Sequence, residues 1–148
     1  MTSAETQIAN LLYLYAERID AGDLDGAAEL FRDAAIFVAG RDAPVGHLEL
    51  AAIWAEHIKI HSCGTPRTKH IVTNPIIEID KQAATARCRS SYVVLQASAG
   101  FPLQPIAAGR YHDRFAQSDG RWHFVERDYR LLDLVGETHM HLTLPLGH

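Results

Sequence analysis

The stretch that organises this sequence is Arg67-Thr68-Lys69-His70-Ile71-Val72-Thr73-Asn74. Its β-branched residues predict a strand, and the alternation of a strand places His70 and Val72 on the same side. A histidine beside a valine on one strand face is expected to be half-buried or to line a cavity. His70 is therefore either a structural residue or a base, and the choice depends on which groups the first helix brings toward it.

The whole sequence has the size and composition of one globular domain. It has 148 residues, of which 47% are hydrophobic and 22% charged, with a formal net charge of −4. Such a charge does not favour binding to nucleic acid, and we find neither an apolar run long enough to cross a bilayer nor a signal peptide. We expect a cytoplasmic protein with no nucleic-acid or membrane partner. Its cysteines, Cys63 and Cys88, match no zinc spacing and are expected to be free thiols, with a disulfide as the alternative.

The first helix is predicted over residues 4–20. Thr2 and Glu5 have the spacing of a capping box, with Thr2 as the N-cap. Apolar residues then recur at helical intervals, and Gly22 is expected to end the helix.

Two side chains of this helix are candidates for function. Tyr15 lies near the middle of the apolar face, where it either belongs to the core or presents its hydroxyl to a pocket. Asp20 lies in the last turn, where the helix dipole disfavours a carboxylate. Asp20 is therefore either a solvated residue at a helix end or a group with another task.

The remaining pattern predicts an α+β fold in which a curved antiparallel sheet wraps around N-terminal helices and encloses an apolar pocket. Asp23 can cap a second short helix, and Asp119-Gly120 is a strong hairpin turn. The other expected elements are a strand at 35–39, a helix at 47–62, one or two strands at 68–80 around Pro75, a strand at 84–96, a loop at 97–105, and strands at 106–117 and 121–132.

Further side chains are candidates for the pocket. Arg127 is expected to share a strand face with Val125 and Tyr129, so its charge needs a partner. That partner is either a carboxylate (Glu126, Asp128 or Asp113) or a polar group of a substrate. Four residues are expected to be pocket walls, with an ordinary core position as the alternative for each: Phe37, Trp54, Tyr92 and Leu95.

Histidines are numerous, but their spacing does not predict a metal site. His139 and His141 form an i, i+2 pair in the tail, and no carboxylate lies at a supporting spacing. The other histidines considered as ligands are His112, His123 and His148. The sequence also lacks a glycine-rich phosphate loop, so we expect neither a metal nor a cofactor.

Three segments together resemble the SnoaL-like branch of the nuclear-transport-factor-2-like superfamily. They are the first helix with Tyr15 and Asp20, the stretch 67–74, and the ending Asp119-Gly120-Arg121-Trp122-His123-Phe124. The resemblance covers roughly residues 4–133. It implies a cone-shaped α+β domain with a deep apolar pocket, as in scytalone dehydratase, hexachlorocyclohexane dehydrochlorinase and bile-acid 7α-dehydratase, which need no cofactor.

The resemblance also implies roles for individual residues. In those lyases an aspartate near the end of the first helix pairs with a histidine on the strand after the third helix, and Asp20 and His70 match these positions. Tyr15 matches a tyrosine of the bile-acid enzyme, and Arg127 falls where the dehydrochlorinase has a pocket arginine. The second histidine of scytalone dehydratase falls near Leu95 here, so the Asp–His pair carries over but no substrate class does.

The expected function is a cofactor-independent lyase, dehydratase-like, or an isomerase acting on a hydrophobic cyclic small molecule. His70, oriented by Asp20, would remove a proton from carbon, and Tyr15 and Arg127 would assist at oxygen. One alternative is a non-enzymatic ligand-binding domain or accessory subunit. Another is an enzyme of the polyketide cyclase or hydroxylase type.

The chain is expected to divide into a domain at 1–135 and a C-terminal tail at 136–148. The apolar tail segment 142–146 is expected to pack on the pocket mouth or on a neighbouring subunit. Because the lyase relatives are trimers, we expect a homo-oligomer, with a trimer favoured and a dimer as the alternative.

Overall fold

The computed structural model describes residues 2–146, and its first helix, α1, spans Ala4–Asp20 as expected. The N-cap is Ser3 rather than Thr2, because the Ser3 hydroxyl accepts a hydrogen bond from the backbone N–H of Thr6 at 3.1 Å. Thr2 lies one residue too early to reach that N–H group. Gly22 ends the helix with φ +81°, and a Cβ there would lie 2.2 Å from the carbonyl oxygen of Gly64.

Two further helices follow α1, of which α2 packs against α1 and α3 packs against α2. The short helix α2 spans Leu24–Glu29, and the Asp23 carboxylate caps it by accepting a hydrogen bond from the N–H of Gly26 at 2.9 Å. The third helix, α3, spans His47–His57 and is shorter than the predicted 47–62. It ends there because Ile58 is extended and forms a β-bridge with Leu142 of the tail.

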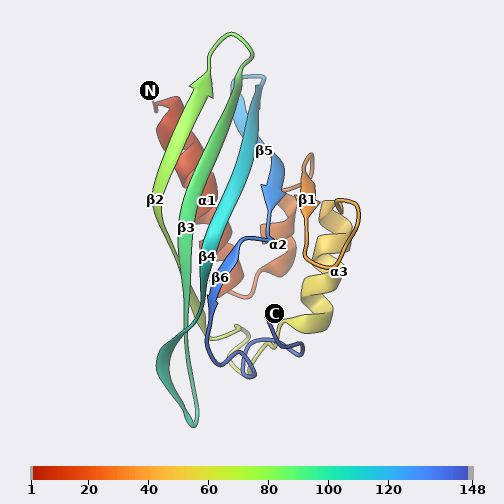
Figure 1. The fold of residues 1–148 in the computed structure, drawn as a ribbon, viewed down its shortest axis with the longest axis vertical. Coiled ribbons are helices and arrows are strands. Elements are labelled where there is room, and N and C mark those ends of the chain that lie inside the picture. The colour runs from red at the N-terminus through yellow and green to blue at the C-terminus, as the bar shows by residue number, and fades with distance from the viewer. Residues whose placement is uncertain (1, 147–148) are drawn as a thin grey trace.

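The sheet contains six strands in the order β1-β5-β4-β3-β2, with β6 paired to β4. Strand β1 pairs parallel to β5, and the other pairs are antiparallel. The curved, unclosed sheet carries α1 across one face, and the C-terminal tail lies near the end of α3 (Figure 1). The strands span Ala35–Phe37 (β1), Thr68–Asp80 (β2), Thr85–Ser98 (β3), Phe101–Ser118 (β4), Arg121–Asp128 (β5) and Leu132–Val135 (β6).

Strand β2 continues through Pro75 as a single strand. Its register against β3 shifts between Thr73 and Ile76, and Asn74 there has φ +42°. Because β2 is at the edge of the sheet, one of its sides pairs with no other strand, and a proline, which has no N–H group to donate, is tolerated there.

The predicted loop at 97–105 is wrong, because β3 and β4 continue as a long hairpin that turns at Ala99 and Gly100. Pro102 and Pro105 are compatible with β4 because β4 is an edge strand over these residues. On the side of β4 that faces away from β3, pairing begins only at Ala107, with β6, and continues farther along the strand with β5.

The core lies between α1, α2 and the inner face of the sheet. Ile8 and Leu12 of α1 and Phe31 after α2 are fully buried against Phe115 and Phe124 of β4 and β5. This packing fixes the position of α1 along the sheet, and it is what places the last turn of α1 beside the start of β2.

The outer face of the sheet carries an apolar row across four strands. The register joins Ile71 to Val93, Val93 to Ala108, and Ala108 to Leu134. Leu134 is 69% exposed. The row is a surface on which another protein chain could pack.

The C-terminal tail is fixed against the segment that follows α3. The N–H of Lys59 donates to the carbonyl of His141 at 2.7 Å, and the N–H of Thr143 donates to the carbonyl of His57 at 2.9 Å. On the other side, the buried Gln96 amide donates to the carbonyl of Met140 at 2.9 Å. The tail therefore has a defined place beside α3 and β3.

Candidate active site

Asp20 and His70 are in direct hydrogen-bonding contact. Oδ1 of Asp20 lies 2.6 Å from Nδ1 of His70, and the two side chains are 15% and 7% exposed. The contact arises because the last turn of α1 packs beside the first residues of β2. Sequence reasoning left the separation of this pair open, and the structure places it within hydrogen-bonding distance.

Asp20 receives two further hydrogen bonds from β2. The hydroxyl of Thr68 donates to Oδ1 at 2.9 Å, and the backbone N–H of His70 donates to Oδ2 at 2.7 Å. These donors stabilise a carboxylate at the end of a helix, where the dipole alone would disfavour it. Asp20 is therefore held rigidly beside His70.

This arrangement determines which nitrogen of His70 carries the proton. An ionised carboxylate only accepts hydrogen bonds, so Nδ1 must donate to Asp20. In the neutral ring the lone pair then lies on Nε2. Because His70 lines a cavity, this lone pair is the group available to remove a proton from a bound molecule.

The cavity has a volume of about 540 Å³ and is mainly apolar. Three of the residues expected at the pocket, Tyr15, Trp54 and Tyr92, line it together with His70. Four residues of the tail segment expected at the pocket mouth or on a neighbouring subunit also line it: Leu142, Leu144, Pro145 and Leu146. The structure adds residues that the sequence did not indicate for the pocket: Ile19, Val38, Ala39, Leu50, Ile53, His57, Ile58, Val94, Ala107, Tyr111, Tyr129, Arg130, Leu132 and His141. The tail therefore forms part of the cavity wall.

Three tyrosines form one wall of this cavity. The rings of Tyr111 and Tyr129 lie 5.9 and 6.4 Å from that of Tyr15, measured between centroids. Burial raises the pKa of each hydroxyl well above its ordinary value, and the nearby charge of Arg127 only partly opposes this. At neutral pH these hydroxyls stay protonated and can donate hydrogen bonds to an oxygen in the cavity.

Arg127 lies behind the tyrosine wall rather than at the cavity surface. Its guanidinium forms a double hydrogen bond with Asp113, at 2.7 and 3.0 Å, and both side chains are completely buried. It lies 3.9 Å from the ring centroid of Tyr111 and 4.4 Å from that of Tyr15. Burial raises the pKa of Asp113, and the charge of Arg127 counteracts the shift.

Arg127 shares an inward face with Tyr129, as expected, but it does not share one with Val125, because β5 contains a bulge. Phe115 of β4 pairs with Phe124, whereas Arg114 pairs with Glu126, so Val125 has no partner in the ladder. The extra residue turns Arg127 to the same inward face as Phe124. Arg127 thus reaches Asp113, one of the three carboxylates that the sequence offered.

Leu95 and Phe37 do not line the cavity with His70. Leu95 is on the opposite face of β3 from Val94, and it is Val94 that lines the cavity. Phe37 lines a second hollow, of about 320 Å³, while its neighbour Val38 lines the cavity.

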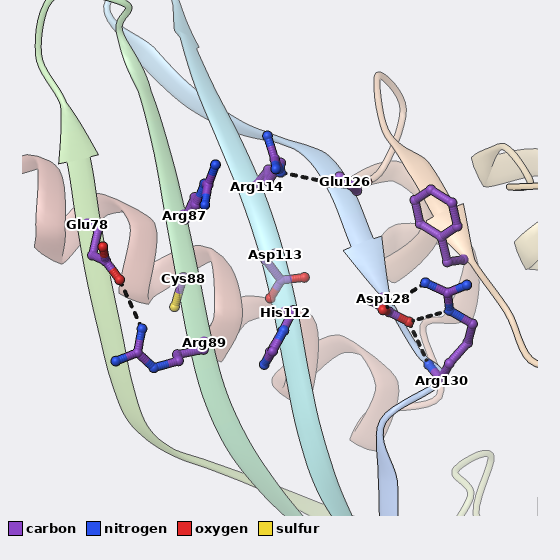
Figure 2. A pocket seen from close by; sticks show the side chains of 11 residues that line it. Glu78, Arg87, Cys88, Arg89, His112, Asp113, Arg114, Glu126, Asp128 and Arg130 are labelled. Atoms are coloured by element: carbon purple, nitrogen blue, oxygen red, sulfur yellow. Dashed lines mark hydrogen bonds and ion pairs between the residues drawn. The ribbon is translucent and has the colours of Figure 1, made fainter.

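The second hollow is charged and lies on the outer side of the sheet. Figure 2 shows three ion pairs there: Arg89 with Glu78, Arg114 with Glu126, and Arg130 with Asp128. Because these charges neutralise one another, this hollow offers less for a bound substrate than the cavity around His70.

Both cysteines are free, with Cys63 exposed and Cys88 buried. Within residues 2–146 no group of three or more metal-binding side chains occurs, and His148 lies outside these residues. No helix in the described chain is long and apolar enough to cross a membrane.

Comparisons with known proteins place this fold among known domains. The family model of the SnoaL-like domain matches residues 1–128. None of the curated proteins matches the chain.

Three solved structures illustrate the similarity. Rv3472 of Mycobacterium tuberculosis, a protein of unknown function, is 28% identical, with 88% of this chain and 72% of that chain covered and a TM-score of 0.67. A candidate scytalone dehydratase from Novosphingobium aromaticivorans is 19% identical, with 97% and 93% covered and a TM-score of 0.69. The beta subunit of a candidate aromatic-ring-hydroxylating dioxygenase from the same organism is 19% identical, with 93% and 95% covered and a TM-score of 0.67. The last two similarities concern the fold alone.

Proposed function

The chain belongs to the SnoaL-like domain family, and from this membership and the geometry of the cavity we propose that it is a cofactor-independent lyase or isomerase. Its substrate is a hydrophobic cyclic small molecule. The observation that carries the proposal is the 2.6 Å contact between Asp20 and His70 on the wall of an apolar cavity.

The proposed reaction begins with proton transfer from carbon to Nε2 of His70. Asp20 holds the ring in the required tautomer and stabilises the imidazolium that forms. The electrons of the broken C–H bond then form a double bond, either expelling a neighbouring hydroxyl as water or moving charge onto a carbonyl oxygen. The proton on His70 returns to the leaving oxygen or to another carbon.

Tyr15 is proposed to stabilise the oxygen on which charge develops. Tyr15 lines the cavity, and the raised pKa of its hydroxyl keeps that group protonated at neutral pH. A protonated hydroxyl in an apolar site is an effective donor to a developing oxyanion. Arg127 would act only through the tyrosines, since it is completely buried behind them.

Dehydration is ranked first among the possible outcomes. The candidate scytalone dehydratase, which shares the fold, supports this order. The chemistry common to dehydration and isomerisation is removal of a proton from carbon, so this step is the one to test first.

The test uses 2-tetralone in D₂O, because its C–H groups beside the ketone are acidic and its two rings suit an apolar cavity. Proton NMR follows the replacement of these hydrogens by deuterium. The native protein should accelerate exchange, and His70→Ala should lower the rate by about 100-fold or more, toward that of buffer. Asp20→Asn should also slow it, whereas His112→Gln, on the outer sheet face, should not. Binding of 2-tetralone without accelerated exchange would contradict the proposal.

The alternative is a ligand-binding or accessory domain without catalytic activity. The similarity in fold to the beta subunit of a candidate dioxygenase supports this alternative. It predicts the outcome just described, in which a cyclic ligand binds in the cavity and its hydrogens do not exchange.

A further inference from the structure

His141 is a second histidine on the wall of the cavity, and it comes from the C-terminal tail. Its position is fixed by the backbone, because Lys59 donates to its carbonyl and the adjacent Leu142 forms a bridge with Ile58. Its ring lies 6.4 Å from that of His70 between centroids, at an angle of 69°. The two histidines therefore line the same cavity although they lie far apart in the sequence.

The side chain of His141 is buried but incompletely satisfied. The residue is 8% exposed, and in the part of the chain that the structure describes Nδ1 is buried without a hydrogen-bond partner. Three other buried side-chain atoms share this property, on Ser90, Gln96 and Trp122, but none of these residues lines the cavity. A buried polar atom without a partner is unfavourable, and Nδ1 is closed off from the cavity itself, so a hydrogen bond from His141 to a molecule in the cavity must come from the other ring nitrogen, Nε2.

The charge state of His141 suits a polar contact rather than an ionic one. Burial lowers its pKa to about 4, and the neighbouring His70 acts in the same direction. At neutral pH the ring is uncharged, so one nitrogen donates and the other accepts. A neutral ring also leaves His70 free to become positively charged when it takes up a proton.

We propose that His141 binds an oxygen of the substrate through Nε2 and thereby selects cyclic molecules that carry a hydroxyl or carbonyl group over pure hydrocarbons. This inference rests on the proposed function, since it assigns a substrate contact within the same cavity. The apolar walls bind the ring system, His70 faces the reacting carbon, and His141 fixes the oxygen beside it.

The experiment compares 2-naphthol with naphthalene, two probes of the same ring system that differ by one hydroxyl. Their dissociation constants are measured with the full-length protein by titration of its tryptophan fluorescence, to which Trp54 on the cavity wall contributes. The native protein should bind 2-naphthol about five- to tenfold more tightly, as one net hydrogen bond provides. His141→Phe should abolish this preference while retaining naphthalene binding, and His141→Gln should retain part of it.

His139→Phe is the matched control, because His139 is exposed and does not line the cavity. It should leave both affinities unchanged. A native protein without a preference for 2-naphthol, or a preference that survives in His141→Phe, would overturn the inference.

A second measurement on the unaltered protein decides the case in which His141→Phe fails to fold. The ¹⁵N resonance of His141 Nε2 should shift on addition of 2-naphthol but not of naphthalene, and an unchanged resonance with bound 2-naphthol would overturn the inference. Neither measurement requires turnover. The contact at His141 can therefore stand if hydrogen exchange in 2-tetralone is absent, and it can fail while exchange is observed.

Discussion

Lowering the pH should destabilise the folded protein through His141. Its pKa falls from the ordinary 6.5 to about 4 in the folded state, because burial disfavours the charged ring. His70 and His61 add to this effect, and Asp20 opposes it. Between pH 4 and pH 6.5 the unfolded chain therefore binds more protons at His141 than the folded chain does. The stabilising contribution is therefore complete above pH 6.5 and is lost as the pH falls toward 4.

The size of the loss follows from the shift. One pKa unit corresponds to about 1.4 kcal/mol. Proton uptake by His141 in the unfolded chain therefore lowers the free energy of unfolding by about 3 kcal/mol in total, of which about 2 kcal/mol are lost between pH 7 and pH 5. Other groups also titrate in this range, and a reference protein without the His141 ring removes their contribution. His141→Gln provides this reference, because glutamine does not titrate.

The assay is urea unfolding of both proteins at pH 7, 6, 5 and 4, followed by circular dichroism. The native protein should lose about 2 kcal/mol more than His141→Gln between pH 7 and pH 5. A difference between the two proteins that stays constant over this range would contradict this prediction, because His141 would then titrate alike in the folded and unfolded chains.

Three further predictions concern other parts of the structure. Asp113→Asn should lower the free energy of unfolding by about 3–5 kcal/mol, since Arg127 would remain buried without its counter-charge, and the double variant with Arg127→Met should recover part of the loss in urea unfolding. Gln96→Leu should cost about 1–3 kcal/mol and speed hydrogen exchange in residues 138–143, because the carbonyls of Pro66 and Met140 lose their donor; unchanged exchange would contradict the role of Gln96 in fixing the tail. We propose that the chain self-associates through the apolar row on the outer sheet face, so Leu134→Glu should lower the sedimentation coefficient, and a native monomer would count against this.

The positions of Asp20 and His70 could be anticipated from the sequence because each rests on a local pattern. Helical periodicity fixed the end of α1 at Asp20, and the alternation of β2 turned His70 inward. Their family resemblance supplied the pairing. Local patterns alone could not show that Thr68 and the N–H of His70 would also bind the carboxylate, since these contacts depend on how α1 packs against the edge of the sheet.

Residues whose positions depend on bulges or on the tail were harder to predict. A single extra residue at Val125 puts Phe124 rather than Val125 on the face of Arg127, and period-two alternation carries no sign of it. His141 has no periodic neighbours at all, so only the docking of the tail against Lys59 brings it to the cavity. The apolar residues that follow His141 were the one signal in the sequence that this segment is packed rather than solvated.

The central claim is that Asp20 holds the Nδ1–H tautomer of His70 and leaves Nε2 unprotonated toward the cavity. Two-bond ¹H–¹⁵N correlation spectra of the histidine rings, recorded at a pH where His70 is neutral, test it directly. We expect a protonated Nδ1 and an unprotonated Nε2 in the native protein, with this preference lost in Asp20→Asn. A neutral His70 protonated at Nε2 in the native protein would contradict the account, because no lone pair would then be available to a substrate.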